Sequence, residues 1–134
     1  MSTKIKLFDY EFKNPIVPAS GTYGFGYEFQ EYYDINCLGS ISLKGTTLNP
    51  RYGNPLPRIA EAPAGLINAI GLQNPGVDKV ISEELPRLSE VYADKVIANV
   101  GGHSIEEYTK TIGGVLGYIK VNEDLTFKSS LDKF

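Results

Sequence analysis

The stretch NAIGLQNPG, residues 68–76, lies between a proline-rich loop and a helical pattern of apolar residues. The motif SLKGTT, residues 42–47, precedes it, and the motif IANVGG, residues 97–102, follows it. Lys44 and Asn99 each stand at the end of a short apolar run, where a parallel strand would finish. Because α/β proteins build their chemistry at the ends of strands, these motifs predict a small-molecule site.

Short apolar runs alternate with helical patterns along the chain. We expect three buried strands, at residues 16–17, 38–43 and 96–100. Helices are predicted at residues 28–33, 77–88 and 105–112. Three strand–helix pairs in this order indicate a parallel sheet covered by helices, and therefore an α/β fold.

The predicted helices carry recognisable terminal signals. Asn74 suits an N-cap and Pro75 the first helical position, and Pro86 should kink or end the same helix. Ser104 and Glu107 form a capping box at the start of the last helix. The inner face of that helix is expected to carry Ile105, Tyr108 and Ile112.

Three further segments flank or interrupt this pattern. Residues 5–12 alternate with strand period and predict an N-terminal hairpin. The prolines of residues 46–72 forbid a continuous helix and indicate an ordered functional loop. Residues 1–112 form the main unit, and the divergent tail, residues 113–134, is expected to fold as a β-hairpin from YIKV (118–121) and LTFK (125–128).

The composition narrows the class of protein. The net charge of −3 without a basic block argues against nucleic acid and against a polybasic membrane anchor. No apolar stretch approaches the length of a membrane-spanning helix, and the N-terminus does not read as a signal peptide. The single cysteine, Cys37, is expected to be buried and inert and fits a cytoplasmic location, and with one histidine it offers no metal cluster.

The polar residues at the strand ends have a functional and a structural interpretation. The Lys44 ammonium can pair with a ring atom or an anionic substrate, or can be a solvated surface lysine. The Asn68 amide suits a carboxylate or an imide edge, or can stabilise a turn. Asn99 and Ser20 can contact a ligand or be satisfied by the backbone.

Four motifs together carry a family resemblance. They are KNPIVPASGTYGFGYEF (13–29), SLKGTTLNPRYGNPLPRIAEAPAGLINAIGLQNPGVD (42–78), EELPRL (83–88) and VIANVGG (96–102). In this order and spacing they resemble the class 1 dihydroorotate dehydrogenases, in particular the catalytic subunit of the NAD-linked type. The resemblance covers residues 5–112 and implies the N-terminal part of a (β/α)₈ barrel, an incomplete barrel with about three βα units after the N-terminal hairpin.

The resemblance also implies a cofactor and a reaction. The family carries FMN and oxidises dihydroorotate to orotate in pyrimidine synthesis. The matching positions imply FMN contacts by Ser20, Lys44, Gly45 and Asn99. They imply substrate contacts by Lys44 and by the loop Asn68, Ala69, Ile70, Gly71 and Leu72. A homodimer and a separate electron-transfer subunit are implied as protein partners.

The family pattern is only partly present in these 134 residues. The Asn-Ile-Ser-Cys-Pro-Asn motif, whose cysteine acts as the family's general base, does not occur, and Cys37 is not its equivalent. The phosphate site after strands 7 and 8 is missing as well. We therefore expect little turnover by this chain alone. The alternatives are a non-enzymatic remnant or oligomerising interaction module, and a stand-alone phosphate binder that uses the loops SGTYGFG or VGG.

Overall fold

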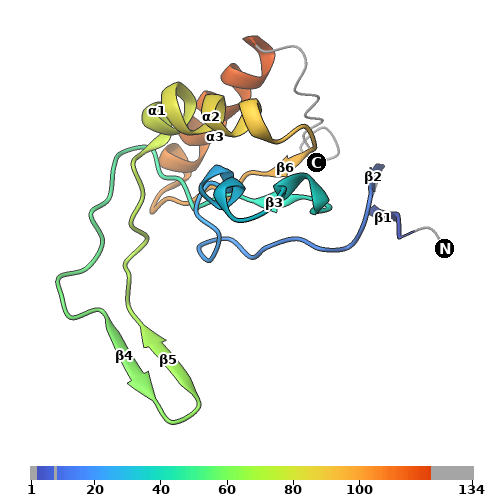
Figure 1. The fold of residues 1–134 in the computed structure, drawn as a ribbon. Coiled ribbons are helices and arrows are strands. Elements are labelled where there is room, and N and C mark those ends of the chain that lie inside the picture. Colours follow the sequence, from blue (N-terminus) through green and yellow to red (C-terminus); the bar gives the residue numbers. More distant parts are fainter. Residues whose placement is uncertain (1–2, 8, 122–134) are drawn as a thin grey trace.

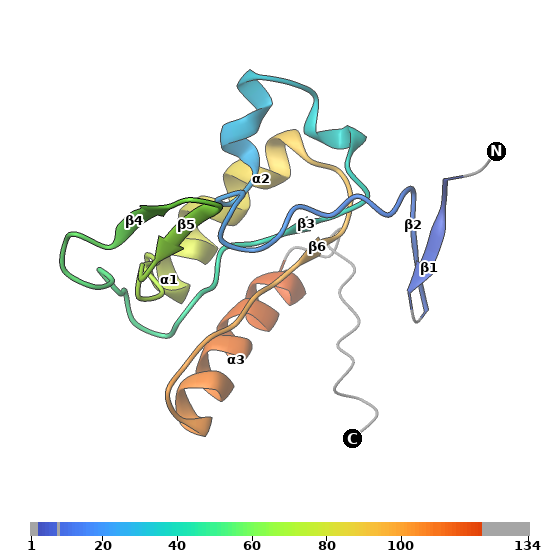
Figure 2. The same ribbon diagram turned by 90° about the horizontal axis from the view of Figure 1, so that it is seen from below.

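The computed structural model describes residues 3–7 and 9–121, and Figures 1 and 2 show a small body from which one hairpin arm projects. The body contains two short parallel strands, β3 (Ile41–Ser42) and β6 (Val96–Ile97). Two of the three predicted strands, at residues 38–43 and 96–100, are thus confirmed as parallel neighbours, although each is shorter than predicted. This arrangement gives the α/β character that the alternating pattern indicates.

The first predicted parallel strand, Ile16 and Val17, is wrong. The two residues are exposed and belong to no strand. The Ile16 N–H bonds to the Asn14 side chain at 2.9 Å, and Pro18 has no N–H to donate. One backbone bond to the body remains here, from the Gly39 N–H to the Ile16 carbonyl at 2.9 Å. With the Ile16 N–H bonded locally and no N–H at Pro18, the segment lies along the body without forming a ladder.

The N-terminal hairpin is confirmed. It pairs β1 (Ile5–Leu7) with β2 (Tyr10–Phe12) in antiparallel register. The short helix predicted at residues 28–33 is present as a 3-10 helix, Tyr27–Glu31, and a second 3-10 helix follows at Ile35–Cys37. The thiol of Cys37 is exposed, so the expectation of a buried cysteine is wrong.

The arm occupies the middle of the segment for which the sequence predicted an irregular loop. Within residues 46–72, β4 (Ile59–Ala62) pairs antiparallel with β5 (Gly65–Asn68). Pro63 lies in the turn between the two strands, and Pro55 and Pro57 precede β4. Proline excludes a helix here but leaves two four-residue strands intact, because it stands outside their ladder.

One helical stretch follows the arm and has three parts. It begins with α1 (Val77–Lys79), continues as a π-helical segment (Val80–Glu84) and ends as α2 (Leu85–Val91). Pro86 lacks the N–H that an α-helix requires, and the wider π turn lies directly before it, so the predicted disturbance is confirmed. The predicted N-cap is wrong, because Gly76 takes the N-cap position and Asn74 lies two residues before it.

The last helix, α3 (Ile105–Val121), is longer than predicted. The Ser104 hydroxyl accepts a bond from the Glu107 N–H at 3.2 Å, which confirms one half of the capping box. The predicted inner face is wrong for Ile105, 87% exposed, and for Tyr108, because Thr111 and Val115 are the buried positions. Residues 118–121 are helical, which contradicts the first strand of the tail hairpin, and residues 125–128 lie outside the described residues.

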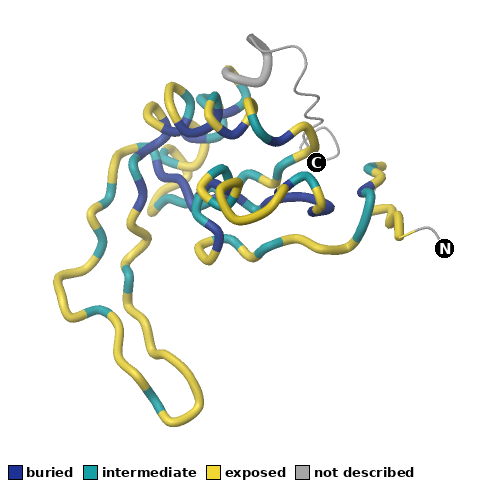
Figure 3. Tube along the Cα trace, viewed as in Figure 1, coloured by how far each residue is buried: buried dark blue, intermediate teal, exposed yellow. Residues whose placement is uncertain are grey.

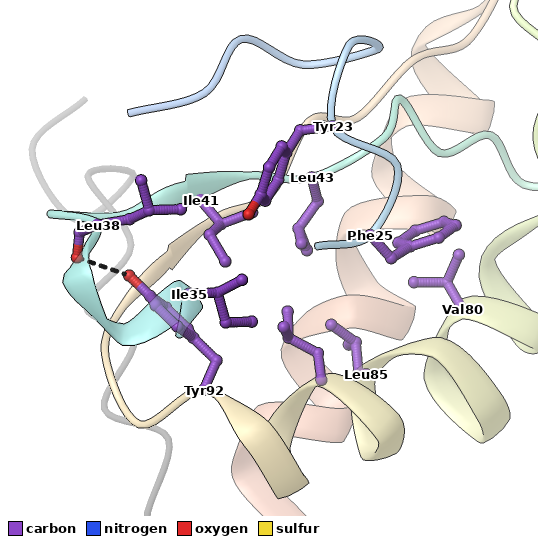
Figure 4. Close-up of a cluster of buried hydrophobic side chains, with 10 residues drawn as sticks. Tyr23, Phe25, Ile35, Leu38, Ile41, Leu43, Val80, Leu85 and Tyr92 are labelled. Atoms are coloured by element: carbon purple, nitrogen blue, oxygen red, sulfur yellow. Dashed lines mark hydrogen bonds between the residues drawn. The ribbon is translucent and has the colours of Figure 1, made fainter. Parts of the chain in front are cut away.

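The core lies between the parallel strands and the helices (Figures 3 and 4). Its buried members come from the loop before the first 3-10 helix, from the second 3-10 helix, from β3 and its flanks, and from the helical stretch after the arm with the residue that follows it: Tyr23, Phe25, Ile35, Leu38, Ile41, Leu43, Val80, Leu85, Leu88 and Tyr92. The arm contributes none of them and is exposed along most of its length, as Figure 3 shows. The core therefore stabilises the strands of the body, whereas the arm is stabilised by its own hydrogen bonds.

Two core tyrosines make the fold sensitive to alkali. Burial raises the pKa of the Tyr23 and Tyr92 phenols above their ordinary value of 10.0. The folded state therefore disfavours phenolate, and its stability is complete below about pH 10 and falls as the pH rises through the raised pKa. We expect the urea concentration at the midpoint of unfolding to be lower at about pH 11 than at about pH 8. This difference should be smaller in Tyr92→Phe than in the wild-type chain. Tyr52→Phe, at a residue 90% exposed, is the control and should leave the drop unchanged.

Candidate functional site

The two segments that follow β3 and β6 continue to run parallel to each other beyond the ends of these strands. The Thr46 N–H donates to the Asn99 carbonyl at 2.9 Å, and the Gly101 N–H donates to the Thr46 carbonyl at 2.8 Å. Thr46 and Val100 also form a parallel bridge. These bonds hold Lys44 and Asn99 at one edge of the sheet, as the strand ends predicted.

A chain of hydrogen bonds links this edge to the segment before the core. The Asn99 Nδ2 donates to the Ser20 hydroxyl at 2.7 Å, and that hydroxyl donates to the Leu43 carbonyl at 2.5 Å. The Asn99 amide is therefore oriented by Ser20. Its Oδ1 makes no hydrogen bond among the residues that the structure describes, and it is free to accept one from a ligand.

The Lys44 side chain is half-buried at the same edge. Its backbone N–H donates to the Gly24 carbonyl at 3.1 Å, which fixes the start of the side chain. Within residues 3–7 and 9–121 its ammonium has no ion pair or hydrogen bond. A lysine ammonium without a protein partner can bind an anionic or electron-rich ligand.

Gly45 marks where the loop of residues 68–72 reaches the strand edge. A Cβ at Gly45 would lie 3.0 Å from Leu72 Cδ1 and 3.4 Å from Asn99 Nδ2. A Cβ at Gly101 would lie 3.1 Å from Leu72 Cδ2. The Leu72 side chain therefore covers two glycines, one after each parallel strand.

The other four residues of the loop lie along the arm. Asn68 pairs with Ile59 as the last residue of β5, and no hydrogen bond joins it to the Lys44 or Asn99 side chain in the described part of the chain. Figure 1 shows the arm projecting from the body that holds β3 and β6. The structure thus brings Ser20, Gly45, Asn99 and Leu72 together, with Lys44 next to Gly45 in the chain, and it leaves Asn68 on the arm.

The stem of the arm is held by its own polar contacts. The Ala69 N–H donates to the Arg58 carbonyl at 2.8 Å, and the Ile70 carbonyl accepts from the Asn54 N–H at 3.0 Å. A Cβ at Gly71 would lie 2.7 Å from the Asn54 nitrogen, so the two backbones pass in close contact. Ala69, Ile70 and Gly71 are therefore fixed in the stem, where they connect Asn68 to Leu72.

Leu72 has a left-handed backbone, with φ of 56°, directly after Gly71 at 78°. This conformation costs a leucine about 1–2 kcal/mol, and strained residues of this kind cluster at functional sites. The conformation turns the chain from the arm back to the body. No sequence pattern at Leu72 announces it, although the preceding glycine is typical of a sharp change of direction.

Other candidate features add nothing at this edge. An open hollow lined by Leu56, Pro57, Arg58 and Ile59 lies on the arm. Among the described residues, no three His, Cys, Asp or Glu side chains gather to hold a metal ion. None of the described helices has the length and apolar content needed to cross a bilayer.

The parallel pairing of β3 and β6 with covering helices makes this an α/β protein, a class that commonly binds small molecules at the carboxyl ends of its parallel strands. Its fold matches the crystal structure of DHODH in complex with ferulenol from Eimeria tenella, with a TM-score of 0.62 over 85% of this chain and 33% of that chain. At 22% identity this likeness concerns the fold, which is that of part of an α/β barrel. The sequence profile of dihydroorotate dehydrogenase matches residues 2–123, and the chain belongs to the dihydroorotate dehydrogenase family of oxidoreductases.

Curated relatives agree with this assignment. The chain is 54% identical over 113 residues to the dihydroorotate dehydrogenase B (NAD(+)) catalytic subunit of Streptococcus pneumoniae, a match that covers 84% of this chain. It is 59% identical over 99 residues to the corresponding subunit of Cutibacterium acnes, covering 73% of this chain. The matches cover 36% and 32% of these relatives, so the chain spans about a third of their length.

Proposed function

We propose that this chain supplies the N-terminal part of an NAD-linked dihydroorotate dehydrogenase site, which oxidises dihydroorotate to orotate with FMN. The observation that carries the proposal is that Lys44 and Asn99 follow the two neighbouring strands, the half-buried ammonium without a partner among the described residues and the amide oriented by Ser20. The family match and the NAD(+)-type relatives supply the chemical class.

The residues at the strand edge fit the ring of a flavin. Flavin rings present carbonyl oxygens and an N–H, which require both donors and acceptors from the protein. Lys44 offers a donor and Asn99 Oδ1 offers an acceptor, and at the buried Gly45 a side chain would crowd Leu72 and Asn99. When bound, FMN supplies the acceptor for the hydride removed from the substrate.

We assign the substrate to the same edge. Lys44 is proposed to contact both ligands, because one ammonium can face an anionic substrate and an electron-rich ring. The substrate loop is proposed to be Asn68, Ala69, Ile70, Gly71 and Leu72. Leu72 already lies over Gly45, whereas Asn68 occupies the arm and depends on the stem to present its amide.

Turnover by these 134 residues alone is expected to be small. The proposed general base belongs to a motif outside this sequence, and loss of a general base costs about 10²- to 10⁴-fold in rate. A second copy and an electron-transfer subunit are proposed as protein partners, since the relatives are named as catalytic subunits. A cytoplasmic location, expected from the single cysteine, and a division at residue 112 stay predictions.

The test is the binding of FMN to the chain, measured as the quenching of flavin fluorescence. We expect the wild-type chain to bind the flavin weakly, because the family's phosphate site is missing from these residues, and Lys44→Ala to weaken binding by about a further tenfold, because a charged hydrogen bond is lost. Lys79→Ala is the matched control, since Lys79 is an exposed lysine of α1 and should leave binding unchanged. Equal affinity of the wild-type and Lys44→Ala chains would remove Lys44 from the site, and no quenching by either would contradict the flavin assignment.

One observation favours a second candidate, an interaction module without enzymatic activity. In the described part of the chain, β6 pairs with β3 alone and leaves its other edge open. Open strand edges pair readily with another chain. A colourless dimer in size-exclusion chromatography, unaffected by FMN, would support this candidate over the enzyme.

A further inference from the structure

A single buried amide joins three parts of the molecule. Asn74 is 5% exposed, and its Oδ1 accepts bonds from the Thr47 N–H at 3.1 Å and the Gly76 N–H at 3.0 Å. Its Nδ2 donates to the Leu72 carbonyl at 2.8 Å. The backbone of Asn74 also exchanges two hydrogen bonds with Arg51, at 2.9 and 3.0 Å. The segment after β3, the start of α1 and the end of the loop thus meet at one side chain.

The surrounding groups determine the orientation of this amide. Two backbone N–H groups face Oδ1, so this atom must be the oxygen, and a carbonyl faces Nδ2, so that atom must be the nitrogen. The Thr47 hydroxyl donates to the Asn49 carbonyl at 2.7 Å and is left to accept from Nδ2 at 2.9 Å. Every polar atom of the amide therefore has a partner of the correct kind.

The bond to Leu72 acts at the strained point of the loop. Leu72 has the left-handed backbone, and its carbonyl is the group that Asn74 holds. The Leu72 methyl groups in turn contact the positions of Gly45 and Gly101. Holding this one carbonyl therefore sets where the end of the loop meets both strand ends.

We propose that Asn74 is a positioning residue for the substrate loop, which holds Leu72 in its left-handed conformation against Gly45 and Gly101. The proposal rests on the proposed function of residues 68–72. Asn74 has no assigned contact with substrate or flavin and acts through Leu72. The amide nitrogen is the atom that matters, because the oxygen serves Thr47 and Gly76 instead.

The decisive variant is Asn74→Asp, studied by NMR in the full 134-residue chain. A carboxylate keeps the acceptor for Thr47 and Gly76 but presents a second acceptor to the Leu72 carbonyl. In this variant near neutral pH, we expect the nuclear Overhauser effects between the Leu72 methyl groups and the α-protons of Gly45 and Gly101 to lose more than half of their intensity. They should recover as the pH falls and the acid becomes protonated, because a neutral carboxyl group can donate to Leu72.

Two further variants complete the design. Asn74→Ala should lose the Leu72 nuclear Overhauser effects at every pH. Thr47→Ser, which keeps the hydroxyl, should preserve them. Effects within the core, such as those between Ile35 and Ile41, should persist in all variants. The proposal is overturned if Asn74→Asp keeps the Leu72 effects unchanged, or if both Asn74 variants lose the core effects too, which would make the residue a general determinant of folding.

Orotate added to the same samples separates this inference from the proposed function. If orotate shifts the wild-type resonances, we expect Asn74→Asp to bind it about tenfold more weakly near neutral pH. Equal affinity with a displaced Leu72 would overturn the positioning role in binding. If orotate shifts nothing in the wild-type chain, the substrate assignment fails, and the Leu72 effects still decide whether Asn74 positions the loop.

Discussion

Replacing Ile41 by alanine is expected to lower the free energy of unfolding by about 2–5 kcal/mol. Ile41 is fully buried in β3, and Figure 4 shows its side chain among the buried residues on the strand side of the core. The substitution removes buried apolar surface and leaves a cavity that the short strand cannot close. Since folded domains are stable by only about 5–15 kcal/mol, the loss takes a large share of the total.

Urea unfolding measures this effect, and Ile105→Ala is the matched control. Ile105 begins α3 and is 87% exposed, so the same substitution should change the stability by less than about 0.5 kcal/mol. Equal losses in the two variants would show that β3 is not part of the core. Because Lys44 follows β3 by two residues, the Ile41 variant should also weaken FMN binding.

Gly39→Ala is expected to destabilise the fold by about 3 kcal/mol, at the upper end for crowding of a packed site. A Cβ at Gly39 would overlap the Asn14 carbonyl oxygen and lie 2.9 Å from the Asn14 carbonyl carbon. The obstacle is backbone, and it cannot move aside easily. The Asn14 Nδ2 donates to the Cys37 carbonyl at 2.8 Å, and the Gly39 N–H donates to Ile16.

Gly113→Ala provides a control with the opposite sign. Gly113 lies exposed within α3, and a Cβ there would meet nothing within 4 Å. Alanine favours the helix over glycine by about 1 kcal/mol, so this variant should be more stable than the wild-type chain. Thermal unfolding of the two variants gives the comparison, and a loss of stability in both would contradict the steric explanation at Gly39.

The elements that the sequence predicted correctly are those fixed by local pattern. The apolar runs before Lys44 and Asn99 form parallel strands, and such runs are typical of parallel sheets. Ile16 and Val17 have the same apolar character and fail to form a strand. Pro15 and Pro18 flank the segment and the Ile16 N–H bonds locally to Asn14, features that hydrophobicity alone does not reveal.

The structure of the arm and the start of the helical stretch after it were not predicted, because both depend on contacts between residues that are distant in the sequence. Two four-residue strands within a proline-rich segment give weak local signals, and their pairing depends on register. Asn74 precedes a helix and resembles an N-cap, yet its amide binds Thr47, 27 residues away, and Leu72. A side chain that can bond locally or at long range cannot be assigned from sequence alone.

In the candidate site too, some residues were placed correctly by the sequence pattern and others depend on contacts that the sequence does not reveal. Lys44 and Asn99 lie at the strand ends because the sheet itself brings those ends together, and Ser20 joins them through its bonds to Asn99 and the Leu43 carbonyl. Asn68 belongs to the same motif as Leu72, but three residues of the stem separate them, and the arm carries Asn68 away from the body. Resemblance of motifs identifies which residues act together, whereas the backbone between them decides where each one lies.

The exposed thiol of Cys37 has a practical consequence for every measurement of assembly. It is the only cysteine in the sequence, and it lies at the surface. In air, two chains can therefore become covalently joined at this position without any pairing of strand edges. A reducing agent abolishes such a species and leaves a non-covalent dimer intact. The same uniqueness makes Cys37 a ready attachment point for a single fluorescent or spin label on the unaltered chain.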